Sequence, residues 1–235
     1  MGNGFEHYCP QHILMLVLIA AAVTAGAVTI KHITERKAEY ILRLLSVFIF
    51  AGETVQDILL VKDGRLLTDF LPLHLCNLGI FINLAASFAR GKTRSYFSEI
   101  SVVLILPGAA AALLFPTWNY RPFWSYLPLL CFFTHALLVF VTVAFLRLQY
   151  AHIRLSHYWY APLFLTAVTP FIYLLDKKIS QDYMFLLDPG GAPPLELLYG
   201  VTGQRFYMAG LAALVLLILA AEYAVYEAAR KKSDF

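Results

Sequence analysis

The sequence predicts an all-α fold, a polytopic transmembrane helical bundle with seven spans. The chain has 235 residues, of which 60% are hydrophobic and 14% are charged. Soluble domains carry about 25% charged residues, so this deficit indicates a membrane protein. The apolar runs are too long and continuous for the alternating strands of a transmembrane barrel. Successive spans pack together, so we expect a single bundle domain over residues 1–235.

Each predicted span is long and apolar enough to cross hydrocarbon, which takes ~20 residues of helix. The spans lie at about 13–30, 40–60, 69–89, 99–115, 123–146, 159–175 and 206–226. A signal peptide requires Lys or Arg before its apolar core, and no such residue precedes the first span. We therefore interpret this segment as a retained span. A long outer loop, 176–205, separates the last two spans.

Lysine and arginine residues in the loops predict the orientation. Segments 31–39, 90–98, 147–158 and 227–235 hold 11 of the 18 such residues, and the loops on the other side hold 6. By the positive-inside rule the richer side is cytoplasmic. We therefore expect the N-terminus outside, the C-terminus in the cytoplasm, and a multi-pass protein of a bacterial cytoplasmic membrane. Aromatic residues such as Trp118 and Trp124, at the start of the fifth span, are typical interfacial anchors.

Charge and cysteine content exclude several classes. The net charge of +3 is small and spread over the loops, so no nucleic-acid partner is expected. Cys9, Cys76 and Cys131 stand far apart with no CxxC spacing. This pattern argues against a disulfide framework and against a zinc site built on cysteine spacing. We expect no cofactor.

The third span concentrates polar groups in an apolar run. It carries His74, Cys76, Asn77 and Asn83. Hydrocarbon tolerates such groups where they face the protein interior or a wet cavity. In a helix, His74 and Asn77 share one face at i, i+3, and Cys76 and Asn83 share another at i, i+7. A membrane cysteine is commonly a small packing residue, and that interpretation of Cys76 stays open at this point.

Two other spans offer partners at a similar depth. Glu53, Gln56 and Asp57 stand at i, i+3 and i+4 in the second span, on one helix face. Alternatively, that span ends early and leaves them among the headgroups. His135 lies near the middle of the fifth span, where an imidazole must form a hydrogen bond or bind a ligand. Counted from the outer side, Cys76 lies ~10 Å deep and His135 ~18 Å deep.

These depths allow adjacent helices to place a thiol beside an imidazole. The imidazole takes the proton and stabilises the nucleophilic thiolate. Glu53, Asp57 or Asn77 would then orient the imidazole as a third member. In a bilayer the substrate of such a site is a lipid acyl ester or thioester, so acyl transfer through a cysteine thioester is the natural reaction class.

Four motifs follow one another along almost the whole chain: Leu71-Pro72-Leu73-His74-Leu75-Cys76, then Pro107-Gly108-Ala109 with Leu114-Phe115-Pro116, then His135, then Asp182-Tyr183-Met184-Phe185-Leu186. Their order resembles the YwaF-like family of integral membrane proteins. The resemblance implies a relation to eukaryotic membrane lysophospholipid acyltransferases with a Cys/His site. The resemblance also implies a more distant relation to androgen-induced-gene membrane hydrolases, which pair a threonine with a histidine.

Carried over by position, the resemblance places the nucleophile at Cys76 and its partner at His135. It implies membrane lipids as partners, with a lysophospholipid or an acyl donor as substrate, and either transfer or ester hydrolysis as the reaction. The chain departs from the family pattern at Asp182, where Asn is expected, and at the end of the sixth span, which lacks an expected Asn.

Two other functions stay open from the sequence. A transporter or an ion- or proton-coupled carrier would use Glu53, Asp57, His74 and His135 as an intramembrane polar path. Metal or haem binding would use His74, Cys76 and His135. Against it, an i, i+2 spacing spreads His74 and Cys76 around a helix.

Overall fold

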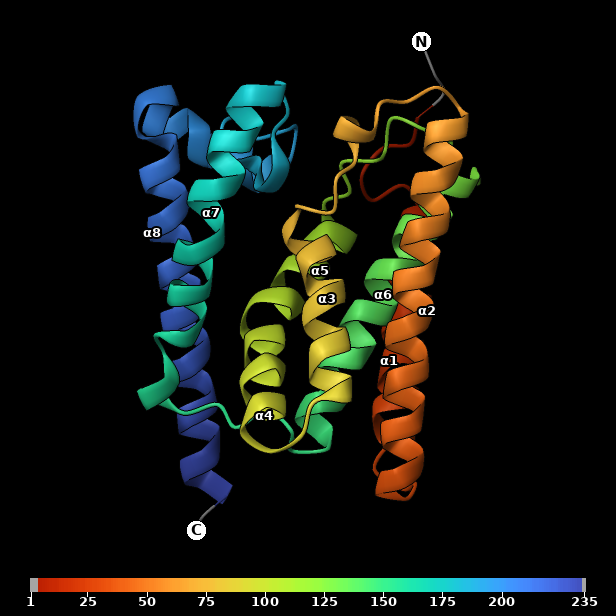
Figure 1. Ribbon diagram of the computed structural model, residues 1–235, viewed down its shortest axis with the longest axis vertical. Coiled ribbons are helices and arrows are strands. Elements are labelled where there is room, and N and C mark those ends of the chain that lie inside the picture. The colour runs from red at the N-terminus through yellow and green to blue at the C-terminus, as the bar shows by residue number, and fades with distance from the viewer. Residues whose placement is uncertain (1–3, 234–235) are drawn as a thin grey trace.

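The protein is described here by a computed structural model that covers residues 4–233 and is helical throughout, with no strand in that range (Figure 1). The ends of the predicted domain, residues 1–3 and 234–235, lie outside the described residues. The α-helices are α1 (Pro10–Thr29), α2 (Glu35–Lys62), α3 (Leu75–Phe88), α4 (Gly91–Ile100), α5 (Leu106–Leu114), α6 (Tyr126–Arg147), α7 (Tyr160–Ile179) and α8 (Pro193–Ser233).

Short helical segments join these helices. A π-helical turn, η2 (Ser101–Ile105), connects α4 to α5 without a break in the helix. Three 3-10 turns, η1 (Leu67–Asp69), η3 (Leu155–His157) and η4 (Tyr183–Phe185), lie in the connections. We refer to the end of the bundle where α8 finishes as the C-terminal end, and to the end where α1 begins as the N-terminal end (Figure 1).

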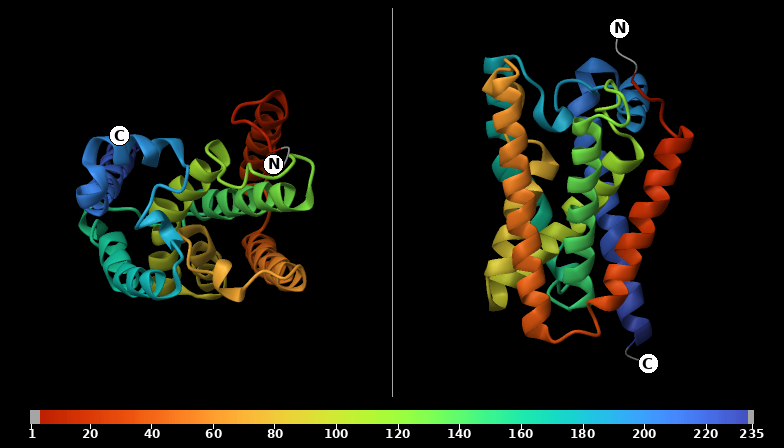
Figure 2. Two further views of the ribbon diagram at one scale, coloured as in Figure 1. Left: turned by 90° about the horizontal axis from the view of Figure 1, so that it is seen from above. Right: turned by 90° about the vertical axis from the view of Figure 1, so that its right-hand side faces the viewer.

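The bundle is layered around the continuous segment Gly91–Leu114. This segment is the most deeply buried of the membrane-length helices. α6 packs against it and lies between α1 and α2, and α3 fills the space between α2, α4 and α6 (Figure 2). α7 and α8 form the layer on the far side of the segment (Figures 1 and 2).

Six helical segments are long and apolar enough to cross a membrane: Pro10–Thr29, Glu35–Lys62, Gly91–Leu114, Tyr126–Arg147, Leu155–Ile179 and Pro193–Lys231. Their outer faces carry large exposed apolar side chains, such as Val17, Leu163, Leu174 and Leu217, each more than half exposed. Apolar exteriors of this extent are what lipid requires of a protein surface. The chain is therefore a membrane-embedded multi-pass protein.

The predicted third span, 69–89, is wrong at its start. The helix begins only at Leu75 and has 14 residues, about 21 Å in length. Pro72 explains the delay, because proline lacks an N–H and disfavours helical backbone in the residue before it. The unwound backbone is stabilised by the Tyr183 hydroxyl, which accepts from the Leu71 N–H at 3.2 Å.

The predicted loop 176–205 is also wrong at both ends. α7 continues to Ile179 and stops at Ser180, whose φ of 55° is left-handed. α8 begins at Pro193, a residue suited to the first turn of a helix. Gly203, with φ 67° and ψ 167°, then interrupts α8, a conformation that suits glycine because it has no Cβ. The non-helical stretch is thus short and is folded over the N-terminal end of α3.

Candidate functional site

α2 and α3 are joined at the N-terminal half of the bundle by a side-chain hydrogen bond. The Asn77 amide donates to the Glu53 carboxylate. α2 continues through Lys62, so Glu53, Gln56 and Asp57 lie inside the helix. Asp57 Oδ1 is buried and has no hydrogen-bond partner.

The late start of α3 changes the position of each polar residue in this span. His74 is the residue before the helix, with extended backbone (φ −63°, ψ 152°), and Cys76 is the second helical residue. The Leu78 N–H is the first to bond back, to the His74 carbonyl at 2.9 Å. Earlier N–H groups of the helix have no intrahelical partner, so the thiol stands where a helix favours negative charge. Helix N-termini are a known environment of reactive thiolates.

His74 is held by the short loop before α8. Its Nδ1 accepts from the Met184 N–H at 3.3 Å, and its ring meets the Tyr183 ring edge-on with centroids 5.3 Å apart. An Nδ1 that accepts a hydrogen bond carries no proton, so in the neutral ring Nε2 carries the N–H. His74 therefore offers a hydrogen-bond donor at Nε2.

The loop that holds His74 is itself fixed by Asp182. Its carboxylate accepts from the backbone N–H groups of Leu186, Leu187 and Asp188 at 2.8–3.1 Å. Burial raises the pKa of Asp182, although these three N–H groups act in the opposite direction. The carboxylate stabilises a turn in which Met184 and Phe185 have φ of 65° and 56°, left-handed values that non-glycine residues seldom adopt.

The two ring nitrogens of His135 have the opposite roles from those of His74. Its Nδ1 lies 2.7 Å from the carbonyl oxygen of Cys131, one turn earlier in α6. A carbonyl only accepts, so Nδ1 carries the proton and Nε2 keeps the lone pair. The Trp118 ring stacks on the imidazole with centroids 4.9 Å apart and an interplanar angle of 28°. His135 thus offers a base at Nε2, with its ring orientation fixed on two sides.

These groups form one cluster at the meeting of α2, α3 and α6. His74 and His135 are close enough to interact electrostatically, and Cys131 lies within the same range of Glu53 and Cys76. Over residues 4–233 no hydrogen bond joins Cys76 directly to His135. The structure therefore joins Glu53 to Asn77 directly and brings His74 within electrostatic range of His135, whereas the pairing of Cys76 with His135 stays a prediction.

Asn83 belongs elsewhere. It accepts from Ser101 at 2.5 Å, and Ser101 in turn bonds Thr142 at 2.8 Å. This buried network joins α3, η2 and α6 toward the C-terminal half of the bundle, about two helical turns from Cys76. Interhelical bonds of this kind stabilise helix packing in membranes.

A pocket of about 220 Å³ opens beside the cluster at the N-terminal end. It is lined by Gln56, Leu60, Arg65, Asp69, Phe70, Thr117, Trp118, Tyr120, Arg121, Leu127 and Cys131. Two of these, Trp118 and Cys131, are the residues that contact His135. The pocket therefore borders two neighbours of the imidazole.

Sequence reasoning missed two members of this site. The sequence pattern indicates an interfacial anchor at Trp118 and indicates no role for Cys131. The i, i+4 spacing of Cys131 and His135 was the available signal for the second. In residues 4–233 there is no group of three or more His, Cys, Asp and Glu residues that could hold a metal ion.

The fold and the site define a class, a multi-pass helical membrane protein whose polar residues gather between its helices beside a pocket. Comparison of the sequence with protein families identifies the family within this class. The model of the TMEM164 family matches residues 7–223, and the chain belongs to that family. No curated protein and no solved structure matches the chain. The family match supports the membrane class, whereas the YwaF-like resemblance and its acyltransferase relation stay predictions.

Proposed function

We propose that the protein is a membrane enzyme that acts on lipid acyl chains through a covalent thioester on Cys76. The reaction is acyl transfer to a lysophospholipid or, with water as acceptor, hydrolysis of the ester. The observation that carries the proposal is that His135 Nδ1 faces a carbonyl oxygen whereas His74 Nδ1 faces a backbone N–H. These partners favour a base at His135 Nε2 and a donor at His74 Nε2, near Cys76.

In the first step His135 Nε2 takes the proton of the Cys76 thiol, and the sulfur attacks the carbonyl carbon of the acyl donor. The unpaired N–H groups at the start of α3 stabilise the thiolate. The tetrahedral intermediate collapses as the alcohol leaves, and His135 returns the proton to the leaving oxygen. The acyl group is then held as a thioester on Cys76.

In the second step the acceptor hydroxyl or water gives its proton to His135 Nε2 and attacks the thioester. The acyl chain leaves on the acceptor, and the sulfur regains the proton. In both steps negative charge develops on the carbonyl oxygen. The His74 Nε2–H is the side-chain donor suited to stabilise that oxygen.

Glu53 and Asn77 support this arrangement as structural partners. Their hydrogen bond holds α3 against α2 and so positions the segment with His74 and Cys76. Gln56 lines the pocket, and Trp118 and Leu127 give it apolar surface for an acyl chain. The pocket is the route by which the ester reaches His135.

The test is an activity assay of the full chain reconstituted in liposomes that contain a fluorescent phospholipid and a lysophospholipid. Both the free fatty acid and the new diacyl lipid are measured. Cys76→Ser is expected to lower both products by about 100-fold or more, because serine is the weaker nucleophile here. Cys9→Ser, at a free cysteine outside the cluster, is the control and is expected to stay within a few-fold of wild type. Equal activity of Cys76→Ser and wild type contradicts the proposal.

A carrier is the second candidate, and one observation favours it. Asp57 Oδ1 is buried in α2 without a partner, one turn from Glu53, as in an intramembrane path for protons or ions. Glu53, Asp57, His74 and His135 would form that path. A dye-based proton flux that is lost in Glu53→Gln and kept in Cys76→Ser would support the carrier over the enzyme.

A further inference from the structure

A network of uncharged polar side chains is buried in the C-terminal half of the bundle, apart from the Cys76 cluster. It comes from α2, α3, the segment Gly91–Leu114 and α6. Polar groups at this depth have no solvent to bond with, so their hydrogen bonds have to be made inside the protein. The members of this buried polar network are at most 3% exposed: Ser46, Asn83, Ser87, Ser98, Ser101 and Thr142.

Four hydroxyl groups of the network use their hydrogens within it. Ser101 donates to Asn83 Oδ1 at 2.5 Å, so the Ser101 oxygen accepts from Thr142 at 2.8 Å. Ser46 donates to the Asn83 backbone carbonyl at 3.5 Å, which leaves Ser87 as the donor in their contact at 2.9 Å. A hydroxyl has one hydrogen, so these four groups have no further donor to offer.

Two groups of the network have no partner among residues 4–233. Asn83 Nδ2 and Ser98 Oγ are both buried and form no hydrogen bond there. With the Asn83 amide turned around, its oxygen takes the unpaired place, so one end of the amide is unsatisfied in either orientation. Ser98 lies three residues before Ser101 on the same helix face, next to the bonded part of the network. A buried polar group without a partner is costly, so a ligand that supplies one is favoured.

The π-turn η2 adds a backbone acceptor beside Ser101. The Leu106 N–H bonds to the Ser101 carbonyl and so does not serve the Val102 carbonyl. The next residue, Pro107, has no N–H to donate. The Val102 carbonyl therefore lacks both of its helical donors, in a residue that is fully buried. Turns of this kind are frequent at functional sites.

The unsatisfied groups indicate a small neutral ligand. Asn83 and Ser98 offer donors, whereas the Val102 carbonyl needs one. The network has no charged side chain, and burying an ion there would require a compensating charge. Water both donates and accepts, and a buried water typically makes about three hydrogen bonds to such groups.

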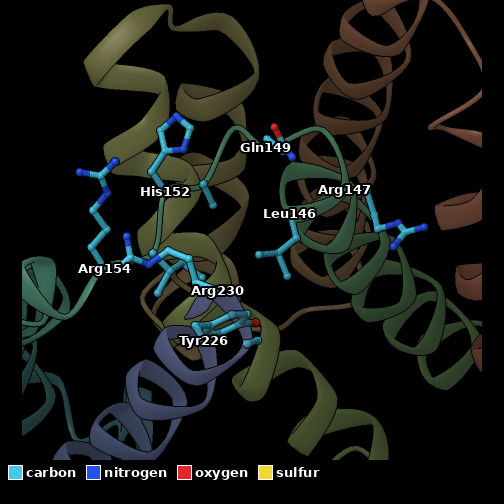
Figure 3. A pocket seen from close by; sticks show the side chains of 10 residues that line it. Leu146, Arg147, Gln149, His152, Arg154, Tyr226 and Arg230 are labelled. Atoms are coloured by element: carbon cyan, nitrogen blue, oxygen red, sulfur yellow. The ribbon is translucent and has the colours of Figure 1, made fainter. Parts of the chain in front are cut away.

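The network also lies close to a hollow that opens at the C-terminal end of the bundle. The hollow has a volume of about 650 Å³ and lies between the end of α6, the α6–α7 connection and α8 (Figure 3). Leu146 lines it, together with polar residues such as Gln149 and His152 (Figure 3). Leu146 follows Thr142 by one turn on the same face of α6, ~6 Å along the helix. The hollow thus comes within about one helical turn of the network.

We propose that the buried polar network is a water-binding site between α3 and the π-turn. The bound water pairs with the free end of the Asn83 amide and with the Ser98 hydroxyl, and it donates to the Val102 carbonyl. It thereby completes the hydrogen bonds that join α2, α3, η2 and α6. The proposal is independent of the acyl chemistry, because no residue of the Cys76 cluster belongs to this network.

The experiment is water-edited solid-state NMR of the full chain in liposomes, with ¹⁵N in the asparagine side chains. Asn83→Leu identifies the Asn83 signal by its loss, and correlation to the Asn83 backbone identifies it independently. Ser98→Ala removes one partner of the water. Ser125→Ala is the matched control, because it removes an exposed hydroxyl at the other end of the bundle. Thermal unfolding in the same lipid establishes that each variant is folded.

In wild type the Asn83 side chain is expected to receive magnetisation from water at short mixing times, although the residue is 0% exposed. Ser98→Ala should slow this transfer several-fold, and Ser125→Ala should leave it unchanged. Absence of the transfer in wild type overturns the proposal, as does equal transfer in Ser98→Ala and wild type. Exchange of sodium chloride for choline chloride should not move the Asn83 signal. A signal that moves with sodium would identify a bound cation and would also overturn the proposal.

Discussion

The Nδ1 atom of His135 lies 2.7 Å from the carbonyl oxygen of Cys131, within the same helix. This contact fixes the tautomer and leaves the Nε2 lone pair directed away from the backbone of α6. His74 has the reverse tautomer because a backbone N–H from the loop before α8 occupies its Nδ1. One imidazole is thus prepared to take a proton and the other to donate a hydrogen bond.

His135→Gln is expected to lower the rate of Cys76 acylation by about 100-fold or more, because a glutamine amide cannot act as a general base. The measurement is single-turnover acylation of the full chain by a chromogenic acyl ester in micelles. His32→Gln, an exposed histidine at the other end of the bundle, serves as the control and should acylate as wild type does. A His135→Gln rate near the wild-type rate would show that His135 is not the base.

Trp118→Leu is expected to lower the same rate by about tenfold, since it removes the ring that stacks on His135 and leaves the imidazole fixed on one side only, by the Cys131 carbonyl. Trp118→Phe should recover most of the loss. Trp124→Leu is the matched control, because Trp124 is 64% exposed at the same end of the bundle. If the Trp124 and Trp118 variants lose equal activity, the stack has no special role.

Asn77→Leu is expected to destabilise the fold by about 1–3 kcal/mol, because it leaves the Glu53 carboxylate without its partner between α2 and α3. The double variant Glu53→Leu with Asn77→Leu should recover part of that loss, since neither polar group is then stranded. Free energies of unfolding in mixed micelles give the double-mutant cycle. Strictly additive losses would mean that the two side chains do not interact.

Glu99→Ala is expected to cost about 1–3 kcal/mol, because it removes a buried acceptor and leaves His157 and the Tyr223 hydroxyl without their partner. Tyr223→Phe removes one of these donors and should cost about 1 kcal/mol. The same unfolding measurement applies, with the exposed Glu35→Ala on α2 as control. A Glu99→Ala variant as stable as the control would show that the bonds of Glu99 do not hold the α6–α7 connection against α4 and α8.

The sequence predicted the helical membrane class because long apolar runs can satisfy their backbone only as helices in lipid. It did not predict where α3 begins, because Pro72 does not by itself decide between a kink inside a helix and a delayed start. The delayed start moves Cys76 from the middle of a helix to its second residue. Its position at a helix N-terminus was therefore not predicted.

The residues of the cluster were predictable as polar groups in an apolar setting, but their contacts were not. The tautomers of His74 and His135 depend on backbone groups of Met184 and Cys131, and no side-chain pattern indicates those partners. Asn83 was grouped with Cys76 from helical periodicity alone, and Ser101 binds it in a separate network. Glu99 was treated as the edge of a span, although a carboxylate next to an apolar run was a signal of burial.

The most direct test of the account is to locate the acyl group on the protein. The full chain in micelles is mixed with a thioester or ester acyl donor, quenched in acid, digested and analysed by peptide mass spectrometry. The account predicts an acyl group on the peptide that contains Cys76, removed by neutral hydroxylamine as a thioester is, and absent from Cys76→Ser. Product formation with no acyl group on Cys76, or with the acyl group on Cys131 instead, would contradict it.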